Sequence, residues 1–398
     1  MSVQLAMRVL KSTTPKVQFK FAYNFGWKGM RSVQRFKKGL KQGKVFPPFL
    51  YVSIINSCNL RCRGCWVDVA SPQTKISLED MNRMITSAKK HGNRFFGILG
   101  GEPFMHPELM DMLAAHPDCY FQIFTNGQYI TDEVAQQLAK LGNATPLISV
   151  EGDTVESDVR RGREGVLDKT LAGIEAAVRA KLLVGVATSV CATNFDQLVS
   201  TDWVDKLIDL GVHYAWFHTY RAVGPDSAPE LALTPEQILA VRRFAVEMRN
   251  EKSIGFVDAY WDDEGQALCP AATGISHHIS PTGAVEPCPI VQYANESIHD
   301  NDGDIYKTIT ESAMLADFRK TAAKATRGCI VLERPDLVLD VAKRHGSTDT
   351  TQRGESFQEL EAMLPRPSQH DPGNEIPEKH WMYRFAKKHW FFGFGAYT

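Results

Sequence analysis

Three closely spaced cysteines are the residues best suited to chemistry in this sequence. Cys58, Cys62 and Cys65 form a C-x3-C-x2-C pattern directly after an apolar, strand-like run. A loop this short can turn three thiolates toward one point, as an iron–sulfur or soft-metal site requires. A structural zinc site usually closes with a fourth Cys or His at short spacing, whereas the next such residues here are His91 and Cys119. An odd local count also argues against a disulfide. The pattern therefore favours a [4Fe–4S] cluster with one iron left free of protein ligands.

Further motifs follow at the ends of later strand-like runs. They are Gly100-Gly101-Glu102-Pro103, Thr125-Asn126-Gly127 and Ser149-Val150-Glu151-Gly152. Together with the cysteine pattern, and in this order, they resemble the radical S-adenosylmethionine (AdoMet) enzymes over about residues 49–225. The resemblance implies that the three cysteines ligate a [4Fe–4S] cluster and that AdoMet chelates its free iron.

The resemblance also assigns contacts to AdoMet. In the family the GGEP motif holds the AdoMet amino group, so Gly101 and Glu102 inherit that role, and Gly100 lets the backbone approach closely. The S-x-E-G motif implies that Ser149 meets the AdoMet carboxylate and that Glu151 meets the ribose hydroxyls. The chain has Glu where many members have Asp, which leaves the reach of this carboxylate open.

The resemblance also implies that a later R-G element supplies a basic partner for the AdoMet carboxylate. By the match this partner is Arg161, although the adjacent Arg160 is an alternative. Three more positions complete the expected AdoMet pocket, namely Asn126, Thr188 and Trp66. The alternative for Asn126 is an ordinary turn, and the alternative for Thr188 is a position in a core strand. Ser189 is a neighbouring candidate for the same role as Thr188.

One position departs from the family. Members often have an aromatic residue just before the third cysteine, where it helps to cover adenine. Here Gly64 occupies that position and the aromatic residue is Trp66. Either the tryptophan or the backbone alone would then serve.

The sixth strand-like run carries an alternating polar and aromatic pattern. Tyr214, Trp216, His218 and Tyr220 share one face of an extended chain. Facing inward they would form a wall of the substrate pocket, and facing outward they would pack against helices. His218 and Tyr220 are the candidate catalytic residues, because they lie near the carboxyl end of the strand.

A second group of cysteines lies in the C-terminal half. The C-x13-G-x4-C spacing of Cys269 and Cys288 resembles the start of the auxiliary-cluster domain called SPASM, or its shorter form, twitch. With Cys329 these thiols would hold one auxiliary [4Fe–4S] cluster, whose fourth ligand comes from elsewhere or from substrate. The two remaining cysteines, Cys119 and Cys191, are expected to be buried structural thiols.

A scaffold must bring these residues together. Strand-like segments at residues 49–56, 94–100, 120–125, 147–151, 182–190 and 213–221 alternate with helix-like segments at 78–91, 107–115, 132–141, 167–180 and 195–210. This alternation predicts an α/β fold with a parallel sheet. Six such units suit the partial (βα)6 TIM-like barrel that the resemblance implies, followed by a C-terminal auxiliary iron–sulfur subdomain. Every motif falls at the carboxyl end of a strand, where such barrels place reactive groups.

The remaining segments divide the chain. Residues 1–48 precede the barrel at 49–225, the auxiliary-cluster region spans 226–345, and 346–398 contain a loose linker followed by an aromatic and basic tail. No Asp or Glu precedes Asp68, whereas the first 67 residues contain thirteen Lys or Arg. The N-terminal segment predicts a basic amphipathic helix that either packs on the barrel or binds an anionic membrane surface. The tail likewise either docks back or contacts a membrane.

Bulk properties narrow the class of protein. The net charge of −1 over 398 residues argues against a nucleic-acid partner. No apolar run approaches the ~20 residues of a membrane span, and no signal peptide is evident. We therefore expect a cytoplasmic protein, with membrane-surface contact left open by the two basic segments.

The function follows from the resemblance. It implies reductive cleavage of AdoMet to a 5′-deoxyadenosyl radical that abstracts a substrate hydrogen, with a reducing partner such as flavodoxin or ferredoxin. Modification of a peptide or protein is the leading interpretation, although no separate leader-binding domain precedes the barrel. The alternatives are modification of a lipid or isoprenoid at the membrane surface and, in another class, a non-catalytic iron–sulfur electron carrier or scaffold.

Overall fold

A nine-stranded sheet forms the centre of the computed structural model, which describes residues 2–69, 72–258 and 260–389. Its strands are β1 (Phe49–Ser53), β2 (Phe95–Leu99), β3 (Tyr120–Thr125), β4 (Ala144–Ser149), β5 (Gly185–Val190), β6 (Tyr214–Thr219), β7 (Gly255–Val257), β8 (Ser276–Ile279) and β9 (Val285–Glu286). Their order is β7-β6-β5-β4-β3-β2-β1-β8-β9. All neighbours are parallel except β8 and β9. The six predicted strands are present, and the sheet is that of a partial TIM-like barrel.

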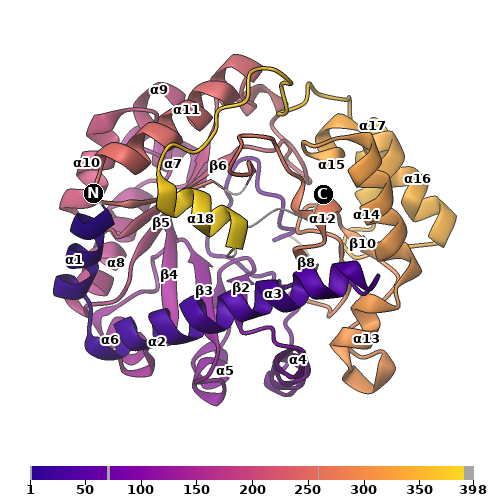
Figure 1. The fold of residues 1–398 in the computed structure, drawn as a ribbon, viewed down its shortest axis with the longest axis horizontal. Helices are drawn as coiled ribbons and strands as arrows, with labels where there is room; N and C mark the ends of the chain where they lie inside the picture. Colours follow the sequence, from indigo (N-terminus) through magenta and orange to yellow (C-terminus); the bar gives the residue numbers. More distant parts are fainter. Residues whose placement is uncertain (1, 70–71, 259, 390–398) are drawn as a thin grey trace.

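Helices cover the outside of this sheet (Figure 1). They are α4 (Leu78–Lys90), η2 (Pro103–Met105), α5 (Leu109–Ala115), α6 (Asp132–Leu141), α7 (Thr154–Arg161), α8 (Val166–Arg179), α9 (Phe195–Leu198), α10 (Thr201–Asp209), η3 (Pro229–Leu231) and α11 (Pro235–Glu251). The helix α4 begins where the sequence predicts, because the Ser77 hydroxyl accepts a hydrogen bond from the backbone N–H of Asp80. The short α7 was not predicted. Its sequence is mostly polar, its two apolar residues Val155 and Val159 are exposed, and Asp153 caps it.

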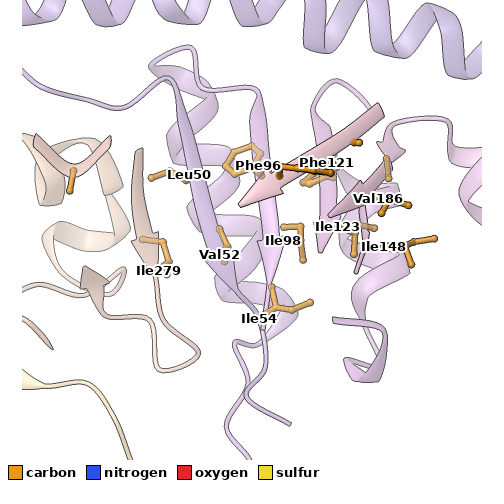
Figure 2. Close-up of a cluster of buried hydrophobic side chains, with 14 of the residues drawn as sticks. Leu50, Val52, Ile54, Phe96, Ile98, Phe121, Ile123, Ile148, Val186 and Ile279 are labelled. Carbon is orange, nitrogen blue, oxygen red and sulfur yellow. The ribbon is translucent and has the colours of Figure 1, made fainter. Parts of the chain in front are cut away.

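Alternating side chains separate the two faces of the sheet. Figure 2 shows residues such as Val52, Ile98 and Ile123 in the core between the strands and the helices. The intervening residues point to the barrel interior, where Leu147 and Trp216 belong to a separate apolar cluster. Because successive side chains of a strand alternate in direction, each strand contributes both to this core and to the interior wall.

The basic N-terminal segment crosses the amino ends of the strands (Figure 1). It comprises α1 (Ser2–Ser12), α2 (Pro15–Lys20), the π-helical η1 (Phe21–Trp27) and α3 (Lys28–Lys41). Phe21 packs edge-on against Tyr120, and Phe25 packs edge-on against Phe95. Packing on the barrel is therefore one role of this segment. Among the described residues, no helix is both long and apolar enough to cross a membrane.

The C-terminal part adds to the main sheet and then forms a helical layer beside it. Its elements are α12 (Pro270–Thr273), β10 (Tyr293–Ala294), η4 (Asn301–Gly303), α13 (Ile305–Thr310), α14 (Ala313–Ala325), α15 (Ile330–Glu333), α16 (Pro335–His345), β11 (Thr348–Asp349), α17 (Ser356–Ala362) and α18 (Trp381–His389). The predicted hairpin around Gly283 is formed by β8 and β9, and β8 pairs with β1. Residues 346–379, for which a loose linker is expected, include β11 and α17 and end near the fully buried Glu378.

Candidate functional site

The three-cysteine loop follows β1 at the carboxyl end of the barrel. Burial raises the pKa of Cys58 to about 11 and that of Cys65 to about 12, and the nearby thiol of Cys62 adds to both shifts. The backbone N–H groups of Leu60 and Val67 donate to the first and last of these sulfurs and oppose the shifts. Three mutually close thiols with N–H donors form a donor set that suits an iron–sulfur cluster.

Within the described ranges, no group of three or more His, Cys, Asp or Glu side chains is placed to hold a single metal ion. Zinc ligands must converge tetrahedrally on one ion, whereas the cysteines of a cubane each bind a different iron. Three cysteines without a fourth Cys or His at short spacing therefore agree better with a cluster than with structural zinc.

The GGEP turn joins the cysteine loop to the end of β3. Backbone N–H groups of Gly101 and Glu102 donate to the carbonyls of Ile55 and Ser57, both over 2.8 Å. A Cβ on Gly101 would overlap the Ser57 carbonyl oxygen, so this close approach requires glycine. Gly100, with φ +155°, makes the same kind of approach to Ile55.

Glu102 is fully buried and organises three loops. Its carboxylate accepts hydrogen bonds from the Thr125 hydroxyl (2.7 Å), the Asn126 N–H (2.8 Å) and the Phe104 N–H (3.1 Å). Burial nevertheless raises its pKa to about 7. The Asn126 side chain in turn donates to Asn59 of the cysteine loop over 2.7 Å. These two predicted AdoMet contacts therefore also have a structural role.

An ion pair lies beside the second cysteine. Arg161, at the end of α7, donates from Nη2 to Glu151 Oε1 over 2.5 Å and from Nη1 to Cys62 Sγ over 3.6 Å. Burial disfavours the charged guanidinium, but these two acids outweigh it and raise the pKa of Arg161. Glu151 also accepts a hydrogen bond from the Ser189 N–H over 3.2 Å. Three predicted site residues, Cys62, Glu151 and Arg161, thus meet at the cysteine loop.

The neighbouring Arg160 points elsewhere. Its guanidinium lies 5.0 Å from the ring centroid of Tyr220. Its Nε and Nη1 are buried and have no hydrogen-bond partner among the described residues. Arg160 therefore remains available to a bound carboxylate, as the sequence left open.

The glycine before the third cysteine is covered by a ring from another strand. Gly64 has φ +72°, and a Cβ there would overlap the Tyr220 hydroxyl. That hydroxyl donates to the Ser227 carbonyl over 2.7 Å. Trp66 instead packs edge-on against His278 of β8, with ring centroids 5.7 Å apart. Tyr220, rather than Trp66, lies over the position that the family often fills with an aromatic residue.

The other predicted AdoMet contacts divide between the two faces of the sheet. Ser149 is half-buried at the end of β4 and shares the interior face with Leu147. Thr188 lies on the opposite face of β5, as Val186 and Val190 do, and its buried hydroxyl has no partner within the described chain. The structure therefore places Thr188 toward the helices, and Ser189 toward the interior.

A histidine-centred wall faces the barrel interior. The His218 ring stacks on Trp216 at 5.0 Å and 16°, and its Nδ1 lies 2.9 Å from the Tyr260 hydroxyl. Burial, together with Arg221, lowers the pKa of His218 to about 3. Tyr214, Trp216 and His218 share one face, and that face is the interior one, which the sequence left open. Tyr220 follows the strand and packs in a separate cluster with Cys191.

The C-terminal cysteines converge although they are far apart in the sequence. Burial raises the pKa of Cys288, and the thiols of Cys269 and Cys329 add to this shift. Cys269 and Cys329 precede the first residues of α12 and α15, and the backbone N–H groups of Ala272 and Ile330 donate to the Cys269 sulfur. Like the first group, this second group consists of thiols that lie close to one another, two of which, Cys269 and Cys288, have pKa values raised by burial and receive backbone N–H donors. Cys119 and Cys191 are each fully buried.

Sequence reasoning missed two residues between these groups. Arg221 lies within electrostatic range of all three C-terminal cysteines, and these thiols outweigh its burial and raise its pKa. Its guanidinium also lies 4.3 Å from the ring centroid of Tyr260. Arg221 could have been found as a charge at the carboxyl end of a barrel strand. No local signal marks Tyr260, which the fold alone brings to His218.

Comparisons with known proteins agree with this geometry. Residues 52–201 match the model of the Radical SAM superfamily. The chain is 24% identical over 213 residues to the AdoMet-dependent heme synthase of Methanosarcina barkeri, which is 52% of this chain and 60% of that protein. It is also 24% identical to the PqqA peptide cyclase of Streptomyces rochei, over 61% of this chain and 69% of the cyclase. The match to the sporulation killing factor maturation protein SkfB of Bacillus subtilis is 25% identical and covers 40% of this chain and 39% of that protein.

Solved structures show the same fold. Streptococcus suis SuiB bound to precursor peptide SuiA superimposes with a TM-score of 0.60 and 17% identity, over 75% of this chain and 72% of SuiB. Native anSMEcpe with bound AdoMet superimposes with a TM-score of 0.54 and 16% identity, over 70% of this chain and 86% of that one. The match over residues 52–201 identifies this part of the chain as a radical SAM domain, and members of that superfamily use a [4Fe–4S] cluster and AdoMet.

Proposed function

We propose that this protein is a radical SAM enzyme that abstracts a hydrogen atom from its substrate. A [4Fe–4S] cluster held by Cys58, Cys62 and Cys65 would, when reduced, supply the electron for cleavage of bound AdoMet, and the 5′-deoxyadenosyl group so released would be the hydrogen acceptor. The proposal rests on one observation. Motifs from the ends of four parallel strands meet at the cysteine loop, through Glu102 and Asn126 on one side and Arg161 on the other.

Each part of this site has a proposed role. Cys58, Cys62 and Cys65 hold the catalytic cluster. The Gly100–Glu102 turn receives the AdoMet ammonium group, since a buried carboxylate with raised pKa gains from a cation beside it. Ser149 and Arg161 hold the AdoMet carboxylate, and Glu151 holds the ribose. Asn126, Thr188 and Trp66 remain proposed members of the pocket; the placement of Thr188 supports its proposed contact least.

The interior wall is proposed to hold the substrate. His218 is neutral at physiological pH, so it can accept or donate a hydrogen bond without adding a charge near the cluster. Tyr220 closes the cysteine loop and limits access of water. These are the proposed roles of the two candidate catalytic residues.

A second cluster is proposed at Cys269, Cys288 and Cys329. Their convergence around a buried guanidinium supports this assignment, because Arg221 offsets the negative charge of a thiolate-bound cluster. The fourth ligand comes from elsewhere or from substrate. A reductant such as flavodoxin or ferredoxin would supply the electrons.

The proposed substrate is a peptide or protein. The relatives support this class, since they include a PqqA peptide cyclase and SuiB bound to a precursor peptide. A lipid is the second candidate, and it is favoured by an apolar cavity inside the barrel.

Iron analysis and AdoMet cleavage together test the proposal. Anaerobically reconstituted protein should contain about eight irons per chain, falling to about four when Cys58, Cys62 and Cys65 are replaced by Ala. The EPR signal of the catalytic cluster should change on addition of AdoMet, and dithionite should then yield 5′-deoxyadenosine. A reduced protein that binds clusters but neither responds to AdoMet nor cleaves it would instead be an electron carrier or scaffold.

A further inference from the structure

An apolar cavity of about 550 Å³ lies at the amino ends of the barrel strands, opposite the cysteine loop. Its walls include the first residues of several strands, among them Phe49, Phe95, Tyr120 and Tyr214. The N-terminal helices and α18 close it from outside (Figure 1). The AdoMet motifs all lie at the other end of the strands, so this cavity is separate from the cofactor pocket.

The lining of the cavity is almost entirely hydrocarbon. Leu5, Val9 and Leu10 of α1 and Phe21 and Phe25 of η1 face the strand residues. A cavity of this size and polarity is typical of a site for an apolar small molecule. Among its lining residues, Gln122 Oε1 and Trp216 Nε1 are buried without a hydrogen-bond partner in the described part of the chain.

The segments at the rim combine exposed apolar side chains with many Lys and Arg residues, of which Arg384 and Lys388 of α18 pair with Glu264 and Asp263. On α1, Val3, Met7 and Leu10 are exposed, and on α18 Trp381 and Met382 are exposed. The whole segment from α1 to α3 contains no acidic residue. Surfaces of this composition bind the interface of anionic membranes.

The two basic segments lie together at this rim. Lys37 of α3 donates a hydrogen bond to the carbonyl of Lys388 in α18. Met382 and Tyr383 of α18 line the same cavity as Leu5 and Leu10 of α1. The sequence separates these segments by more than 300 residues, but the fold makes them one surface around one opening.

We propose that the cavity binds the hydrocarbon chain of an anionic membrane lipid, with its headgroup at the basic rim. The chain enters between α1 and α18 and extends to Trp216. Because Trp216 also belongs to the proposed substrate wall, where it stacks on His218, the tip of the chain lies against that wall. The site therefore supports a lipid as the second candidate substrate. Only the idea that the bound lipid is a substrate rests on the proposed function, because lipid binding itself does not require radical chemistry.

The test measures chain binding directly. Displacement of the fluorescent probe 11-(dansylamino)undecanoate from the reconstituted full-length protein is followed with octanoate, laurate and palmitate. Each added methylene should tighten binding by about fourfold until the chain fills the cavity. Binding that is absent, or equal for the three acids, would overturn the proposal.

Two variants and a matched control locate the site. Ala6→Trp narrows the opening and Val257→Phe fills the interior, and each should weaken palmitate binding at least about tenfold through lost apolar burial. Ala114→Trp adds the same indole to an exposed position of α5, outside the cavity, and should leave binding unchanged. Thermal unfolding shows whether each variant is folded. An equal loss in the control would refute the assignment of the site.

Vesicle binding identifies the source of the chain. The protein should sediment with phosphatidylglycerol vesicles at low salt, less so at high salt, and little with phosphatidylcholine. A protein that stays in solution with both would refute the membrane source. If only a variant ending at His389 binds palmitate, the chain's own C-terminus is the occupant and the proposal is wrong.

Formation of 5′-deoxyadenosine is measured in the same samples. Cleavage of AdoMet without palmitate binding would refute the cavity assignment alone. Palmitate binding without cleavage would refute the proposed function alone.

Discussion

The guanidinium of Arg161 donates a hydrogen bond to the carboxylate of Glu151 over 2.5 Å, and its other terminal nitrogen reaches the sulfur of Cys62. A residue from an unpredicted helix thereby links the end of β4 to the cluster loop. A cation placed here can hold an anionic ligand at the cluster and balance the charge of the thiolates.

Loss of Arg161 should weaken AdoMet binding. Charge-assisted hydrogen bonds contribute about 1.5–3 kcal/mol, so Arg161→Met should raise the Kd for AdoMet by about ten- to one hundred-fold. Equilibrium dialysis of the anaerobic protein measures this change. Cluster content is determined in parallel, because the same nitrogen contacts Cys62.

The adjacent Arg160 is the matched control. Arg160→Met removes the same charge one residue away, over the ring of Tyr220. We expect a smaller loss of affinity, because this guanidinium lies over the Tyr220 ring, whereas that of Arg161 reaches Cys62. If Arg160→Met weakened AdoMet binding more than Arg161→Met, then Arg160 and not Arg161 would be the residue that holds the AdoMet carboxylate.

Glycine at position 64 should be essential for the cysteine loop. Gly64→Ala adds a Cβ at φ +72° that overlaps the Tyr220 hydroxyl. The left-handed backbone alone costs about 1–2 kcal/mol, and the overlap adds to it. We expect reconstituted Gly64→Ala to lose the catalytic cluster, as measured by iron and sulfide per chain.

A second glycine separates backbone strain from the overlap. Gly165 has φ +69°, and a Cβ there meets no atom within 4 Å. Gly165→Ala should therefore keep its full iron content. Adding Tyr220→Ala to Gly64→Ala should restore much of the lost iron. Equal iron in the two single variants would show that Tyr220 does not press on this loop.

His218 should make the protein less stable in mild acid. Its pKa is about 3 in the folded protein and 6.5 ordinarily, so between these values the unfolded chain binds the additional proton. Stability from this group is present above about pH 6.5 and is lost as pH falls toward 3. Relative to His218→Gln, the wild type should lose about 1–2 kcal/mol between pH 6.5 and 5, which allows for partial solvent screening.

Urea denaturation of both proteins at the two pH values gives this difference. A histidine already protonated when folded would reverse its sign. A parallel decline in both proteins would mean that other groups dominate.

Much of the barrel could be predicted from the sequence, because each strand is an apolar run that is followed by residues that end a strand. β3 and α6 agree with the predicted bounds at both ends, where a buried strand ends at Thr125 and Thr131 caps a helix. The motifs were found for the same reason, since they stand at strand ends. Partners that depend on tertiary packing were not found. Tyr260, for example, reaches His218 only through the fold, and nothing in its local sequence indicates that contact.

The C-terminal segment shows the same limit. Its polar composition suggested a loose linker between residues 346 and 379, because composition does not reveal which charge will be buried. In the structure, Glu378 is fully buried and pairs with Arg242 (2.7 Å), Arg249 and Lys387 (3.2 Å). Asp258 is the second acid of this group and contacts the same three cations.

Removing Glu378 should therefore release α18 from the barrel. Glu378→Gln leaves three buried cations with a single acid, and breaking a buried ion pair in this way costs about 3–5 kcal/mol. We expect a lower thermal midpoint and faster tryptic cleavage near Lys379. Glu375→Gln, in the same segment but only half-buried, is the control and should change neither. Because α18 also lines the apolar cavity, the Glu378 variant should bind palmitate more weakly as well. Unchanged proteolysis with a lower midpoint would place the lost stability in the barrel rather than in the attachment of α18.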